Sequence, residues 1–142
     1  MESAQILLVE DNEGDILLME EALETSKISY TVTVVRNGKD AIDYVLRQGK
    51  YANATLPDII LLDVNLPIKN GHEVLQAIKT NDLVKHIPVI VLTTSSSEKD
   101  IRLSYKHHAN CFVTKPIDVD EFLRAIQSIE HFWFNVVTLS KK

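Results

Sequence analysis

Five apolar segments recur along the chain, and helical spacing of apolar residues follows each of them. They lie at Ile6 to Val9, Tyr30 to Val35, Ile59 to Leu62, Val89 to Leu92 and Asn110 to Val113. The third is a run of four aliphatic residues bounded by Pro57-Asp58 and Pro67, which is typical of a strand buried on both faces of a parallel sheet. Strict alternation of strands and helices predicts an α/β fold in which helices cover both faces of one parallel sheet.

The five helical segments are predicted from their apolar stripes and their starting residues. They begin at Asp15, Asn37-Gly38, Asn70-Gly71, Ser97 and Asp118, and the first runs to about Thr25. Ser97 with Asp100, and Asp118 with Glu121, have the spacing of a capping box. The segment from Gln48 to Thr55 is richer in small and polar residues, so we predict a surface excursion there.

The length of 142 residues fits a single domain over residues 1–142, with its core at about 5–134. After the last helix, the tail at residues 132–142 carries an unusual amount of apolar surface in Phe132 to Leu139. Two alternatives stay open for this tail. It folds back on the edge of its own sheet, or it forms a surface for a partner or for a homodimer.

Charge and composition exclude several classes of protein. A net charge of -5 and a pI near 5.5 provide no basic face for nucleic acid. No apolar run is long enough to span a bilayer, and the N-terminus has no signal-peptide pattern, so we expect a cytoplasmic protein. A single cysteine, Cys111, excludes an intrachain disulfide and agrees with that location.

Acids follow two of the predicted strands directly. Glu10 and Asp11 come after the first strand, and Asp63 comes after the third. If these strands are neighbours, as in the doubly wound order 2-1-3-4-5, the three carboxylates meet at the carboxyl edge of the sheet, where open α/β folds bind ligands. Such a cluster is tolerable only when a hard cation sits among the acids or when some of them stay protonated, and Mg²⁺ is the natural occupant of a small oxygen site.

The fourth and fifth strands end in residues that suit a phosphoryl group. Thr93 would bring a hydroxyl to the same edge, and Lys115 would bring a mobile cation. An Asp carboxylate can act as a nucleophile and form an acyl phosphate, which is one role open to Asp63. A metal ligand or a loop cap are the others. Acids after the first strand, an acid after the third, a hydroxyl after the fourth and a lysine after the fifth are each common alone. The combination of all four in this order is specific.

At these residues the chain resembles the receiver domain of two-component response regulators, a bacterial phosphorelay family with a flavodoxin-like fold of five strands and five helices. The resemblance implies that Asp63 accepts a phosphoryl group from a histidine kinase or a phosphotransfer protein. It also implies an Mg²⁺ ion, with Mn²⁺ as a substitute, held by Glu10, Asp11, Asp63 and the backbone carbonyl of Asn65. The Glu10-Asp11 pair departs mildly from the commoner Asp-Asp.

The same resemblance assigns the remaining roles. Lys115 pairs with the phosphoryl group, and Thr93 and Phe112 form the switch that alters the face made by the fourth helix, the fifth strand and the fifth helix. Asn65 and Ser95 modulate hydrolysis of the acyl phosphate. More narrowly, the Asn-Leu-Pro after Asp63 and the apolar tail resemble small single-domain regulators that pair with phytochrome kinases. In this interpretation the chain signals by protein contact or phosphotransfer, and the switch face with the tail is a candidate homodimer surface.

Two other functions share parts of the pattern. A phosphatase of the haloacid dehalogenase type also forms an aspartyl phosphate, but it needs a second acid two residues after the nucleophile, where this chain has Asn65. Its nucleophile also follows the first strand. The second is a phosphorylation-independent binding module, either a flavodoxin-like domain or a receiver that no longer accepts phosphate. The acids after the first strand, Glu10-Asp11-Asn12-Glu13, would repel a flavin phosphate. A degenerate receiver would usually lack one of the key residues, and all of them are present here. We therefore expect a signalling domain, not an enzyme.

Overall fold

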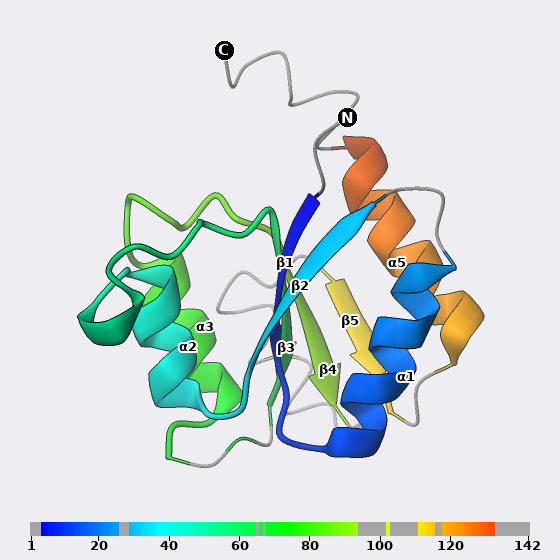
Figure 1. Ribbon diagram of the computed structural model, residues 1–142, viewed down its shortest axis with the longest axis horizontal. Coiled ribbons are helices and arrows are strands. Elements are labelled where there is room, and N and C mark those ends of the chain that lie inside the picture. Colours follow the sequence, from blue (N-terminus) through cyan, green and yellow to red (C-terminus); the bar gives the residue numbers. More distant parts are fainter. Residues whose placement is uncertain are drawn as a thin grey trace.

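The computed structural model describes residues 4–25, 29–64, 66, 68–93, 102, 111–115 and 118–132. Strands and helices alternate along them up to the fourth strand, with one 3₁₀ turn, η1, and a fifth strand and a helix complete the described elements (Figure 1). The elements are β1 (Ala4–Val9), α1 (Glu13–Glu24), β2 (Tyr30–Val35), α2 (Gly38–Val45), η1 (Gly49–Tyr51), β3 (Ile59–Asp63), α3 (Gly71–Lys79), β4 (Val89–Thr93), β5 (Cys111–Thr114) and α5 (Val119–Phe132). The helix expected to begin at Ser97 lies outside the described residues, apart from the helical Arg102, as does the tail after Phe132.

The five strands form one parallel sheet in the order β2-β1-β3-β4-β5. This is the predicted doubly wound order, and it makes β1 and β3 neighbours, with Val9 opposite Leu62. Because all strands run in the same direction, their carboxyl ends share one edge, which lies at the bottom of Figure 1 beside the start of α1. The order therefore brings the residues after β1, β3, β4 and β5 to a common edge.

Alternate residues of the central strands face two separate hydrophobic layers. Leu7 and Ile60 belong to the layer beneath α2 and α3, whereas Ile6 and Ile59 belong to the layer beneath α1 and α5. Figure 1 shows the two helix pairs on opposite sides of the sheet. Since β3 has both of its faces covered, all five of its residues are buried, including the acid that ends it. This explains the unbroken aliphatic run in the sequence.

Two predicted boundaries differ from the observed ones. Helix α1 begins at Glu13, two residues before the predicted start, because the Asn12 side chain caps it by accepting from the Asp15 backbone N–H. The predicted excursion between Gln48 and Thr55 is partly anchored to the core. It contains η1, and the Tyr51 ring packs edge-on against the Tyr44 ring with centroids 5.3 Å apart.

The connection from β3 to α3 returns tightly onto the end of β3. The Gly71 N–H donates to the Val64 carbonyl at 3.0 Å. A Cβ atom at position 71 would lie 2.5 Å from the Asp63 carbonyl oxygen and 2.5 Å from the Val64 Cα, so a larger residue would have to displace the backbone. Glycine at this position thus allows the start of α3 to pack directly against the residue that ends β3.

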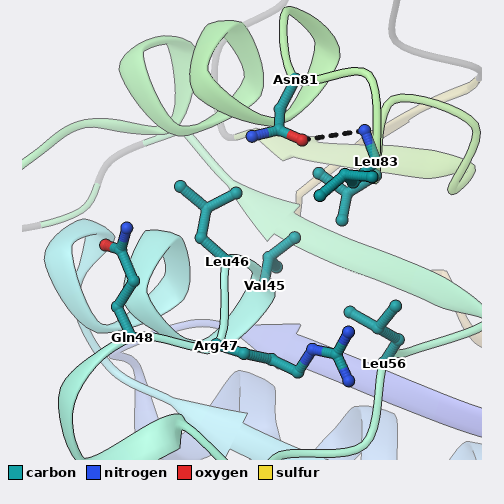
Figure 2. Close-up of a pocket in the computed structure, with 8 residues that line it drawn as sticks. Val45, Leu46, Arg47, Gln48, Leu56, Asn81 and Leu83 are labelled. Carbon is teal, nitrogen blue, oxygen red and sulfur yellow. Dashed lines mark hydrogen bonds between the residues drawn. The ribbon is translucent and has the colours of Figure 1, made fainter.

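The amino edge of the sheet carries different features. A cavity of about 260 Å³ lies between the residues that follow α2 and the connection from α3 to β4, and Figure 2 shows Arg47, Leu56 and Leu83 around it. Nearby, the Lys79 ammonium at the end of α3 donates to the Lys85 and Ile87 carbonyl oxygens at 3.0 and 2.6 Å. These bonds tie the connection to the helix that precedes it.

Candidate functional site

Asp63 ends β3 in the middle of the sheet. It lies opposite Leu92 of β4, and the next backbone N–H, of Val64, still donates to the Leu92 carbonyl at 3.1 Å. The strand ladder therefore holds the backbone on both sides of the acid. The Asp63 residue is only 3% exposed, and a carboxylate is almost never buried to this extent unless it is paired.

Glu10 and Asp11 extend from the neighbouring strand β1. The Glu10 N–H donates to the Val35 carbonyl at 3.1 Å, which continues the β1–β2 ladder by one residue and leaves Glu10 fully buried. Asp11 comes after the ladder and is exposed. One oxygen each from Glu10, Asp11 and Asp63 lies within 4.8 Å of the others. The predicted convergence of the three acids is thus observed.

Lys115 enters this acidic group from the end of β5. Its Nζ atom lies 2.5 Å from Glu10 Oε2, 2.9 Å from Asp15 Oδ2 and 3.5 Å from Asp63 Oδ2, and its side chain is 6% exposed. The lysine and the Glu10-Asp11 pair therefore lie on the same side of the sheet edge as Asp63. A buried ammonium needs such partners, because burial of an unpaired charge is very costly.

Burial and pairing shift the pKa values of both partners in the closest pair. Burial raises the pKa of the Glu10 carboxyl to about 7. The hydrogen bond from Lys115 acts in the opposite direction and lowers this pKa, whereas the nearby Asp63 charge raises it further. Burial alone would lower the pKa of Lys115, but its hydrogen bonds with Glu10 and Asp15 and the nearby charges outweigh burial and raise it. Lys115 therefore stays cationic, whereas a further cation would favour ionised Glu10.

The donor chemistry of the site suits a hard divalent cation. Within the described part of the chain, Glu10, Asp11, Asp15 and Asp63 meet at this edge, and Lys115 is the cation placed against them. An excess of carboxylate charge and a set of oxygen-only donors are what Mg²⁺ and Mn²⁺ sites require. Glu10, Asp11 and Asp63 are the residues able to hold such an ion.

The other predicted site residues are only partly described. Strand β4 ends at Thr93, opposite Thr114 of β5, so its backbone reaches the same edge, but its side chain lies outside the described residues. Asn65 and Ser95 also lie outside them. Phe112 is half-buried opposite Val91 and packs against the layer beneath α2 and α3.

Sequence reasoning missed Asp15. It was predicted only as the first residue of a helix, a place where acids are common, and that local role gives no indication of its contact with Lys115. The sequence contains no signal that distinguishes this acid from others at the same helical position. Only the packing of α1 beside the end of β5 does so.

The chain belongs to the family of response regulator receiver domains, because the family model of the response regulator receiver domain matches residues 6–127. The fold, the strand order and the acidic edge agree with that membership. The predicted resemblance is therefore confirmed at the level of the family and of the flavodoxin-like receiver fold.

Among known relatives, the chain is similar to the response regulator Rcp1 of Synechocystis sp. (strain ATCC 27184 / PCC 6803 / Kazusa), with 46% identity over 94% of this chain and 91% of that protein. The phosphorylated cyanobacterial phytochrome response regulator RcpA has a similar structure, with a TM-score of 0.83, 47% identity and coverage of 94% and 95% of the two chains. The Mn²⁺-bound form of Rcp1 gives a TM-score of 0.81, 44% identity and coverage of 94% and 96%.

These relatives are response regulators, as the narrower resemblance in the sequence anticipates. Within the described ranges, none of the helices combines the length and the apolar character needed to cross a membrane.

Proposed function

We propose that the protein is a response regulator that accepts a phosphoryl group on Asp63 in an Mg²⁺-dependent reaction. The observation that carries this proposal is the convergence on Asp63 of an acidic group suited to a divalent cation and of a buried lysine. Asp63 provides the nucleophile, and Lys115 provides a fixed positive charge for the phosphoryl oxygens. Membership of the receiver family supports the same assignment.

In this reaction an Asp63 carboxylate oxygen attacks the phosphorus of a phosphohistidine presented by a partner kinase or phosphotransfer protein. The new P–O bond forms as the P–N bond breaks, and the histidine nitrogen leaves with the electron pair. Glu10, Asp11, Asp63 and the Asn65 carbonyl would hold Mg²⁺, or Mn²⁺ in its place, which would supply positive charge to the phosphoryl oxygens. The protein contributes chiefly position and charge, which are the main requirements of phosphoryl transfer.

The phosphoryl group then acts as a switch in this proposal. Its oxygens draw in the Thr93 hydroxyl, and Phe112 turns toward the space that Thr93 leaves, which alters the face around β5 and α5. Hydrolysis of the acyl phosphate depends on Asn65 and Ser95. The output passes by protein contact or by phosphotransfer. The likeness to a phytochrome response regulator supports a phytochrome kinase as the donor. A homodimer through this face and the tail is a further proposal, which rests on the apolar residues of the tail sequence.

Substitution of the acceptor tests the proposal directly. Asp63→Asn should abolish phosphoryl uptake from acetyl phosphate or a cognate kinase, because the amide lacks the nucleophilic oxygen, and it should keep the fold. Intact-protein mass spectrometry detects the added phosphoryl group, and Asp43→Asn, which removes an acid of α2 that pairs with Lys39, is the matched control. Stoichiometric labelling of Asp63→Asn would contradict the assignment, as would labelling of the wild type that continues after chelation of the metal.

A further inference from the structure

The helices α1, α2, α3 and α5 begin with the same local arrangement. A cap side chain accepts a hydrogen bond from the backbone N–H of an acid three residues later. The four pairs are Asn12 with Asp15, Asn37 with Asp40, Asn70 with Glu73, and Asp118 with Glu121. In such a pair the acid ordinarily folds back and binds its own cap residue.

The acid of α1 departs from this arrangement. Glu73 accepts from the Asn70 backbone N–H at 3.2 Å, and Asp40 accepts from the Asn37 side-chain amide at 3.0 Å. In α1, however, the Asn12 backbone N–H donates to Glu10 Oε1 at 3.1 Å. Asp15 instead places its carboxylate 2.9 Å from Lys115 Nζ, on a different element of the fold.

Three carboxylates therefore share the Lys115 ammonium, which has three N–H donors. Glu10 and Asp15 are close, at 2.5 and 2.9 Å, whereas Asp63 is farther, at 3.5 Å. The side chains differ in exposure as well, since Asp15 is 25% exposed and those of Glu10 and Asp63 are 0% and 4%. Asp15 is thus the most hydrated of the three partners, and it can exchange Lys115 for water without exposing the buried carboxylates.

We propose that Asp15 is a positioning residue that competes with the phosphoryl group for Lys115. In the unphosphorylated protein it holds the ammonium back from Asp63, and it releases the ammonium when phosphoryl oxygens arrive on Asp63. The inference rests on the proposed function of Asp63 as acceptor. Because an ion pair that breaks on phosphorylation opposes it by the free energy of that pair, Asp15 lowers the affinity of the site for a phosphoryl group.

The first experiment measures the pair itself, without metal or phosphoryl donor. Chemical unfolding of the wild type, Asp15→Asn, Lys115→Met and the double variant forms a double-mutant cycle. Asp15→Asn should lower the unfolding midpoint in the wild-type background by more than it does when Lys115 is already Met, because only the wild-type background contains the ion pair. Equal shifts in both backgrounds would overturn the proposal, and this result does not depend on whether Asp63 accepts phosphate.

The second experiment measures competition, with beryllofluoride as the phosphoryl mimic in the presence of Mg²⁺. Asp15→Asn should bind beryllofluoride about threefold to tenfold more tightly than the wild type, the range expected for one partly buried charge pair. Glu13→Gln is the matched control, because it removes an exposed acid from the same first turn, paired with Arg36, and should leave the affinity unchanged. Asp15→Glu keeps the charge and should retain the wild-type affinity.

Each alternative result has a defined meaning. Weaker binding by Asp15→Asn would show that Asp15 supports the phosphorylated site, and unchanged binding would show that it does not compete; both overturn the proposal. Equally tight binding by Glu13→Gln would attribute the effect to the charge of the helix, and equally tight binding by Asp15→Glu would attribute it to side-chain shape. Either result would overturn the proposal. Failure of the wild type to bind beryllofluoride would overturn the proposed function, and the competition with it.

Discussion

Each edge of the sheet holds a lysine, which is buried in the case of Lys115 and half-buried in the case of Lys79. The partners of the two ammonium groups differ. At the carboxyl edge, Lys115 lies among the carboxylates of Glu10, Asp15 and Asp63. At the amino edge, Lys79 donates to backbone carbonyl oxygens of the connection from α3 to β4. Charged partners raise the pKa of Lys115 above its ordinary value, whereas burial lowers the pKa of Lys79 to about 8.

The difference shows that the chemistry of the partners, more than burial, decides what a buried lysine can do. Carboxylates keep Lys115 charged, so it can serve as a permanent counter-charge for an anionic group that arrives at Asp63. Carbonyl dipoles compensate a charge less fully, so Lys79 is suited to holding a turn in place. Three substitutions and pH measurements test this contrast.

The largest effect is expected for Lys115→Met, which keeps the length of the side chain and removes its charge. Glu10 and Asp63 would be left buried without their cation, so the free energy of unfolding in metal-free buffer should fall by about 3 kcal/mol, the usual consequence of breaking a buried ion pair. Added Mg²⁺ should stabilise this variant more than the wild type, because the ion then relieves a stronger repulsion. Urea unfolding with and without Mg²⁺ measures both quantities. An unchanged stability in metal-free buffer would show that the acids do not depend on Lys115.

A smaller effect is expected for Lys79→Met. The Lys85 and Ile87 carbonyl oxygens would lose their donor, and the free energy of unfolding should fall by about 1 to 2 kcal/mol, the range for partly buried acceptors left unpaired. The affinity for Mg²⁺ should not change, since this lysine lies at the opposite edge from the acids. Lys39→Met, which removes an exposed lysine paired with Asp43, is the control and should change stability little. A loss of Mg²⁺ affinity in Lys79→Met would mean that the two edges are coupled.

The smallest effect is a pH dependence that Lys79 imposes on stability. In the folded protein its pKa is lowered to about 8 from 10.5, so between these pH values the unfolded chain binds more protons than the folded one. The free energy of unfolding should therefore rise with pH in this window, by roughly 1 kcal/mol after allowance for the partial exposure of the side chain. The stability difference between wild type and Lys79→Met should widen accordingly, and below pH 8 it should be constant. A flat difference up to pH 10.5 would show that carbonyls hold Lys79 charged as firmly as carboxylates hold Lys115.

Much of the fold follows from local patterns in the sequence. The unbroken aliphatic run of β3 predicts a central strand, and the alternation of strands with amphipathic helices predicts the parallel sheet. The strand order was expected from the doubly wound fold of the receiver family, which the chain resembles. The convergence of Glu10, Asp11 and Asp63 follows in turn, because parallel strands place their carboxyl ends at one edge. The helix start at Glu13 and the anchored turn η1 were not predicted, since both depend on cap and core contacts that periodicity does not record.

Other features were decided by the tertiary structure. The sequence predicts that Lys115 reaches the acidic edge, but Glu10, its nearest partner, is 105 positions away along the chain. Asp15 shares its local pattern with Asp40 and Glu73, and only the position of α1 directs it toward Lys115. Hydrophobic periodicity is a property of neighbouring residues, so the sequence by itself determined the elements and the edge where they present their polar ends. The strength of a charge pair depends on distance and on exclusion of water, and these exist only after the chain has packed.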